Sequence, residues 1–124
     1  MLQVLLIGCG GFIGTVARYG MATLAYRLLG AAFPYGTMAV NILGCLLIGF
    51  VSIAAEERMM IAPTTRLYLT IGVLGGFTTF SSFGYETLTL LRVGNPTTAL
   101  LYVLASVLTG LTAVWLGGAL ARAI

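Results

Sequence analysis

The 124-residue sequence has no lysine, aspartate or histidine, and its nine charged side chains are six Arg and three Glu. Charged residues make up 7% of the chain, whereas about 25% is typical of a soluble domain. A chain this small lacks the charge to cover its surface in water, which excludes an ordinary soluble domain, and it is too hydrophobic to be disordered. Chemistry that needs His or Asp is also excluded. Two Cys are too few for a disulfide-rich scaffold or a four-Cys zinc site.

Long uncharged stretches fill most of the chain instead, and 60% of its residues are hydrophobic. A helix needs roughly 20 mostly apolar residues to cross about 30 Å of hydrocarbon. The period-two alternation of a membrane β-barrel is absent. The start of the chain has neither a basic segment nor an evident cleavage site, so we expect the first helix to be retained. We therefore predict an all-α membrane protein, a single domain over 1–124 with four transmembrane helices at about 2–26, 34–55, 66–91 and 97–121.

The arginines are divided almost evenly between the two sides that four alternating helices would define. One side would hold Arg58, Arg66 and Arg122, and the other Arg27, Arg92 and, within the first span, Arg18. An excess of Lys and Arg on one side normally fixes the orientation of a membrane protein. Because this excess is nearly absent, the sequence is compatible with insertion in both orientations and with an antiparallel homodimer. A weak preference for a single orientation is the alternative.

Residues 75–83 read G-G-F-T-T-F-S-S-F in the middle of the third predicted span. Glycine costs about 1 kcal/mol relative to alanine inside a helix, and hydroxyl side chains can bond back to the chain and bend it. A break here would free backbone groups at mid-membrane, where they are tolerated only against protein, water or an ion. A glycine-kinked packing helix remains the alternative. Elsewhere, the pairs Gly10/Gly14 and Gly72/Gly76 are typical of close helix contacts in lipid.

Neutral polar side chains recur on the other spans. Thr37 and Asn41 lie one helical turn apart, and four hydroxyls would form a stripe on the last span, at Thr98, Tyr102, Ser106 and Thr109. On the third span, Phe80 and Phe83 share a face with Thr87, while Ser81 and Ser82 point elsewhere. Such hydroxyls often serve only to join helices. Taken together with the predicted break, however, they indicate a polar path across the membrane.

The path is rich in hydrogen-bond donors and poor in formal charge. Arg18 and Glu86 are intramembrane charges, which are functional candidates by default, although snorkelling toward water explains them equally well. A cation path would be expected to use rings of acids, and a proton relay would use chains of His, Asp or Glu. Neither is present. Neutral donors, together with the positive edges of phenylalanine rings, suit a small hard anion.

Three segments in this order resemble the Fluc/CrcB family of small fluoride channels: G-F-I-G-T-V-A-R-Y (11–19), G-T-M-A-V-N-I-L-G (36–44) and G-G-F-T-T-F-S-S-F (75–83). The resemblance covers essentially the whole chain. It implies a passive fluoride exporter in the bacterial inner membrane, built as an antiparallel homodimer with two pores and a structural sodium ion at its centre. Position 82, often Thr in the family, is Ser here and keeps the hydroxyl.

The resemblance also assigns residues. The sodium ligands would be the backbone oxygens of Gly75 and Thr78 from both subunits. The pore and fluoride-binding side chains would be Asn41, Phe80, Phe83, Tyr102, Ser106, Ser81 and Thr37, with Thr79 and Ser82 as further candidates. Arg18 would set the vestibule potential or anchor the structure, and Glu86 would lie near the pore.

Other classes fit the sequence less well. A four-helix multidrug transporter would need a glutamate in the first helix, which this chain lacks. A structural tetraspan subunit would account for the glycines but not for Asn41 and the hydroxyl stripe. No nucleophile–base pair, metal cluster or phosphate-binding loop indicates an enzyme. The arginines are scattered and form no basic patch for a nucleic acid.

Overall fold

The computed structural model describes all residues, 1–124, and contains only helices and their connections. The elements are α1 (Leu2–Leu29), α2 (Tyr35–Glu56), α3 (Pro63–Leu67), the π-helix η1 (Tyr68–Leu74), α4 (Gly75–Phe77), α5 (Phe80–Arg92) and α6 (Pro96–Ala123). Four continuous or nearly continuous runs are long and apolar enough to cross a membrane: Leu2–Leu29, Tyr35–Glu56, Pro63–Arg92 and Pro96–Ala123. The predicted all-α class and the number of helices able to span a membrane are confirmed.

Proline and glycine set most of the helix ends. Pro96 lies in the first turn of α6, where its missing N–H costs nothing, and the Asn95 side chain caps that helix by accepting from the Thr98 N–H at 3.4 Å. Gly30, with φ of 83°, ends α1 in a conformation that residues with a side chain avoid. The third span begins at Pro63 and not at Arg66 as predicted, because a proline at the first helical position starts a helix instead of belonging to the loop before it.

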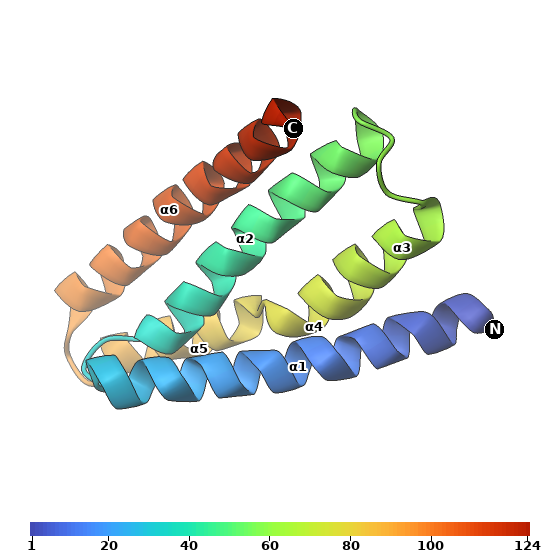
Figure 1. The fold of residues 1–124 in the computed structure, drawn as a ribbon. Helices are drawn as coiled ribbons and strands as arrows, with labels where there is room; N and C mark the ends of the chain where they lie inside the picture. Colours follow the sequence, from blue (N-terminus) through green and yellow to red (C-terminus); the bar gives the residue numbers. More distant parts are fainter.

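The helices form two pairs (Figure 1). One pair is α2 with α6, and the other is α1 with η1 and α4, while α5 lies against α6. In Figure 1 the α2–α6 pair diverges from α1 toward the end of the molecule that holds both chain termini. Gly110 lies opposite Cys45, and Gly118 lies opposite Ile53, so α2 and α6 run in the same direction.

Glycines bring α1 against the third span. A side chain at Gly14 would collide with the carbonyl oxygen of Val73, and one at Gly10 would come within 3.0 Å of the Val73 nitrogen. A side chain at Gly76 would lie 2.5 Å from the carbonyl oxygen of Gly11. The prediction that Gly10/Gly14 and Gly72/Gly76 allow close helix contact is confirmed, since a side chain at Gly72 would likewise come within 3.2 Å of the Gly10 Cα.

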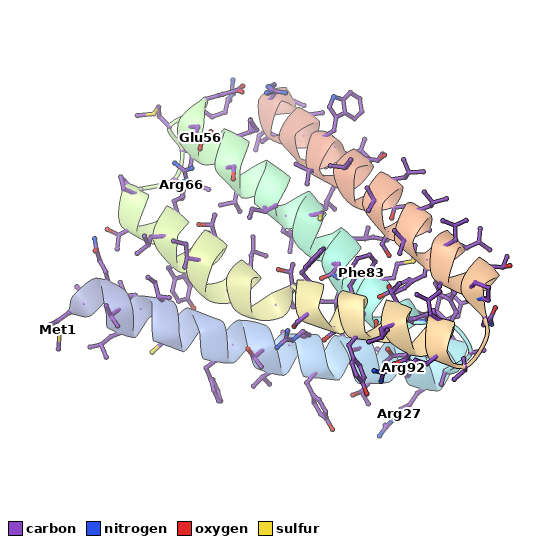
Figure 2. The ribbon with its side chains drawn as sticks, turned by 180° about the vertical axis from the view of Figure 1, so that it is seen from behind. Met1, Arg27, Glu56, Arg66, Phe83 and Arg92 are labelled. Atoms are coloured by element: carbon purple, nitrogen blue, oxygen red, sulfur yellow. The ribbon has the colours of Figure 1, made fainter.

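Only 21 of the 124 residues of the chain are buried, so most of its apolar side chains face outward. In water such a surface would be unstable, whereas lipid or another apolar surface accommodates it. The ion pairs lie at one end of the bundle, where Arg66 contacts Glu56 (Figure 2) and Arg122 contacts Glu57 at 2.7 Å. Hydrogen bonds from the Arg122 guanidinium hold the pKa of Glu57 below its usual value.

Candidate functional site

The third span is interrupted at Thr78 and Thr79. Both residues have extended backbone, with ψ of 157° and 110°, between α4 and α5. The interruption predicted from G-G-F-T-T-F-S-S-F is therefore present, and the alternative of a kinked but continuous helix is wrong. The wider turns of η1 directly before it were not predicted, because nothing local in Y-L-T-I-G-V-L distinguishes a π-helix from an α-helix.

Asn41 of α2 forms hydrogen bonds with the backbone polar groups at the interruption. Its Nδ2 donates to the Thr79 carbonyl oxygen at 3.0 Å, and its Oδ1 accepts from the Thr79 N–H at 2.8 Å. One side chain thus pairs with both polar groups of a residue that has left the helix. Asn41 retains a second Nδ2 hydrogen, because a side-chain amide has two. Since an unpaired backbone group inside a membrane is costly, this clamp accounts for the only Asn within a span.

Carbonyl oxygens in the turn before the interruption lose their helical donors, and those of Gly75 and Thr78 are among them. The Thr79 N–H, which a continuous helix would direct to Gly75, bonds to Asn41. The Ser82 N–H, which would reach Thr78, instead bonds to the Thr79 hydroxyl at 3.2 Å as the cap of α5. Side chains of α1 approach this region: the Arg18 Nη1 lies 3.4 Å from the Thr78 oxygen, and the Thr15 hydroxyl lies 3.4 Å from the Gly76 oxygen. Arg18 therefore turns inward to the interruption and does not snorkel outward.

A hollow of about 380 Å³ adjoins the interruption. Its polar lining includes Asn41, Thr70, Thr78, Thr79 and Ser106. The Phe80 and Phe83 rings lie at its edge with centroids 5.5 Å apart, and Phe83 (Figure 2) lies 5.2 Å from the Tyr102 ring. The Ser106 hydroxyl is buried and has no hydrogen-bond partner in the protein. Phe80, which lines the hollow, is 84% exposed, so the hollow opens onto the surface of the chain.

One helical turn from the hollow, the Glu86 carboxylate accepts hydrogen bonds from three hydroxyl groups. Its Oε1 accepts from Thr37 at 2.7 Å and from Tyr26 at 3.1 Å, and its Oε2 accepts from Tyr102 at 2.7 Å. These donors come from α2, α1 and α6. No arginine bonds to this carboxylate. Glu86 is thus partly buried and turned toward α1, α2 and α6 by neutral donors, and snorkelling does not describe it.

The structure divides the predicted site residues into two neighbouring groups. The first group lines the hollow and comprises Asn41, Gly75, Thr78, Phe80, Phe83 and Ser106. The second comprises Thr37, Tyr102 and Glu86, joined by hydrogen bonds. Ser81 is exposed and lies 3.3 Å from the Thr79 hydroxyl, outside both groups. Of the hydroxyl stripe on α6, Thr109 is exposed and bonds back to the Ala105 carbonyl oxygen instead of joining the others.

Three residues of the site were not predicted from the sequence: Tyr26, Thr15 and Thr70. Thr70 lies in η1 and lines the hollow, and Thr15 reaches the Gly76 oxygen. Tyr26 stands at the predicted end of the first span, where tyrosine is usually explained by the membrane interface. The Tyr26 hydroxyl can be recognised as functional only from its hydrogen bond to Glu86. The sequence does not show that the two residues are close, because their proximity depends on the packing of α1 against α2.

Replacing Asn41 with alanine is expected to lower the free energy of unfolding by about 2–4 kcal/mol, because two backbone groups of Thr79 lose their partners. Unfolding of the purified protein by denaturing detergent measures this change. Ser52→Ala, on the same helix but away from the interruption, is the matched control and should be nearly neutral. Equal stability of the two variants would show that water or another group replaces the clamp without loss.

Comparison with known proteins points to a single family. A family model described as "CrcB-like protein, Camphor Resistance (CrcB)" matches residues 5–118. A Geotalea daltonii protein named "Fluoride-specific ion channel FluC" is 47% identical over 124 residues, which is 100% of both chains. Proteins of the same name from Geobacter sulfurreducens and Chlorobaculum tepidum are 49% and 48% identical over 122 residues, covering 98% of this chain and 98% and 96% of theirs.

Proposed function

This chain belongs to the CrcB-like family, and from that premise we propose that it is a fluoride-selective channel through which fluoride leaves the cell passively. It is an integral protein of the bacterial inner membrane and not an enzyme. The observation that carries the proposal is the hollow at the interrupted helix, which offers neutral donors and no acidic side chain at mid-membrane. These donors suit the passage of a small anion, whereas a cation path would be expected to use acidic side chains.

Fluoride must lose its water to pass such a constriction, which costs tens of kcal/mol if nothing replaces the lost hydration. The donors available are the second Nδ2 hydrogen of Asn41 and the unpartnered Ser106 hydroxyl. The rings of Phe80 and Phe83 add edges that carry the positive part of the ring quadrupole. These groups are weak enough to release the ion, which conduction requires. Chloride is larger and a weaker acceptor, so the same donors favour it less.

We infer an antiparallel homodimer with two pores, inserted in both orientations. The polar hollow opens onto the surface of a single protomer, and polar backbone and hydroxyl groups cannot face lipid. A second copy would close the hollow, and Phe80, exposed in one protomer, would then line the shared passage. The balanced arginines remove the usual barrier to opposite insertion. Impermeant labelling of the C-terminus should therefore succeed from both faces of the membrane.

Sodium at the dimer centre would be held by the carbonyl oxygens of Gly75 and Thr78 from both copies. The donor set fits, since both oxygens have lost their helical donors and oxygen is the ligand that hard cations prefer. Arg18 approaches the Thr78 oxygen only at 3.4 Å, and a carbonyl has a second lone pair to offer. When bound, the ion would supply a fixed positive charge at the middle of the membrane.

Efflux from liposomes tests the proposed function. Purified protein should release trapped fluoride, but not chloride, when a potassium ionophore balances the charge, and a proton gradient should not be needed. Empty liposomes provide the baseline. A proton-coupled multidrug transporter would instead require the gradient and a cationic substrate, and a structural subunit would release neither anion. Either of these two results would refute the channel assignment.

Removing sodium is expected to slow fluoride release, because the four proposed carbonyl ligands would repel one another without the ion between them. The measurement compares liposomes prepared in sodium with liposomes in which choline replaces sodium on both sides. Returning sodium should restore the rate. Unchanged efflux after thorough exchange would contradict a sodium ion at this position while leaving the channel assignment intact.

A further inference from the structure

One of the hydrogen-bond donors to the Glu86 carboxylate, Tyr26, is not among the predicted pore residues. Tyr26, near the end of α1, donates to Oε1 at 3.1 Å, beside the Thr37 hydroxyl that donates to the same oxygen at 2.7 Å. Tyr102 donates to the other oxygen at 2.7 Å. Tyr26 is therefore the link between α1 and a group that otherwise belongs to α2, α5 and α6.

The fold makes room for this tyrosine. Gly36, in the first turn of α2, is buried against it, and a side chain at that position would come within 2.8 Å of the Tyr26 Cε2 and 2.9 Å of the Ala22 carbonyl oxygen. The absence of a side chain at Gly36 thus lets the Tyr26 ring lie across the start of α2. The ring is partly buried there, so its hydroxyl has little freedom to leave the carboxylate.

The Glu86 carboxylate is connected to the hollow through Tyr102. Tyr102 is fully buried, and its hydroxyl is held by Glu86 while its ring lies 5.2 Å from that of Phe83. Thr37 and Tyr102 each lie one helical turn from a residue of the hollow, Asn41 and Ser106 respectively. Glu86 thus helps to fix the Tyr102 ring against which Phe83 packs.

Charge gives Tyr26 a second effect. Glu86 is an acid close to a path proposed for an anion, and no cation bonds to it. Its negative charge is dispersed only by the three hydroxyl hydrogens it receives. Loss of one donor would leave more of this charge directed at the passing ion and would raise the barrier to its entry.

We propose that Tyr26 is a positioning residue for conduction, which acts by holding Glu86 and, through it, Tyr102. This inference rests on the proposed function as a fluoride channel. Tyr26→Phe keeps the ring and removes only the hydroxyl. Fluoride efflux should become roughly three- to ten-fold slower, which is the factor that one hydrogen bond commonly represents. Tyr68→Phe, which removes a hydroxyl from a ring packed against Gly10 on the other half of α1, should leave efflux unchanged.

An infrared measurement separates positioning from a general loss of structure. The difference spectrum between the parent and Glu86→Gln isolates the carboxylate band of Glu86 among only three glutamates. Tyr26→Phe should shift that band because a hydrogen bond to it is lost, and Tyr68→Phe should not. Slower efflux of Tyr26→Phe with an unshifted band, or efflux equal to the parent, would overturn the inference. A parent protein that releases no fluoride would instead refute the proposed function.

Discussion

Replacing Phe83 with isoleucine is expected to slow fluoride efflux by about ten-fold or more, and Phe80→Ile should have a similar effect. Isoleucine is apolar but has no ring edge, so the substitution removes the positive rim while leaving the passage hydrophobic. Each loss of about 1.4 kcal/mol of stabilisation at the barrier slows passage ten-fold. Phe83 also contacts both Phe80 and Tyr102, so its edge is oriented from two sides.

Efflux from liposomes, recorded with a fluoride electrode, measures this effect. Phe12→Ile is the matched control, because Phe12 lies on α1, is 73% exposed and belongs to neither group of site residues. Its efflux should equal that of the parent. If Phe80→Ile and Phe83→Ile both conducted like the parent, the ring edges would have no role in replacing the hydration of the ion.

Replacing Gly14 with alanine is expected to lower the free energy of unfolding by about 3 kcal/mol, at the upper end of the usual cost of overpacking. The new methyl group would meet the carbonyl oxygen of Val73 and would lie 2.8 Å from the Phe77 nitrogen. These are backbone atoms, so no change of side-chain rotamer relieves the collision. α1 must move away from the third span, and with it the side chains of Thr15 and Arg18 that reach the interruption.

Denaturing-detergent titration measures the change, and α1 supplies its own control. Gly20 has no atom within 4 Å of the position where a Cβ would lie, so Gly20→Ala meets no obstacle. It should be neutral or more stable by up to about 1 kcal/mol, because alanine favours the helix. If Gly14→Ala were as stable as Gly20→Ala, the close contact of α1 with η1 would not exist in the membrane.

The sequence was sufficient for the features that depend on local chemistry. Uncharged runs predicted four spans, Gly10, Gly14, Gly72 and Gly76 predicted close contacts, and residues 75–83 predicted an interruption. The hydrogen-bond partners of the polar side chains were harder to predict from the sequence. Asn41 was expected to face an ion, but its amide first pairs with the backbone of Thr79, a residue 38 positions away.

The environment of Glu86 shows why the remainder could not be predicted. Its three partners lie on three other helices, and their hydroxyls converge only when α1, α2 and α6 have packed. The spacing of residues along one helix gives no information about such a group. The π-helical turns of η1, which lie against Gly10 and Gly14 of α1, likewise have no signal in the local sequence.

The pairing of Asn41 with Thr79 has a consequence for motion. Two hydrogen bonds, one to the N–H and one to the C=O of the same residue, reproduce the pattern by which neighbouring strands hold each other in a ladder. These two hydrogen bonds restrict rotation about the backbone dihedral angles of Thr79. The junction between α4 and α5 is therefore a fixed bend and not a hinge, and the shape of the hollow beside it is set when α2 packs against the third span.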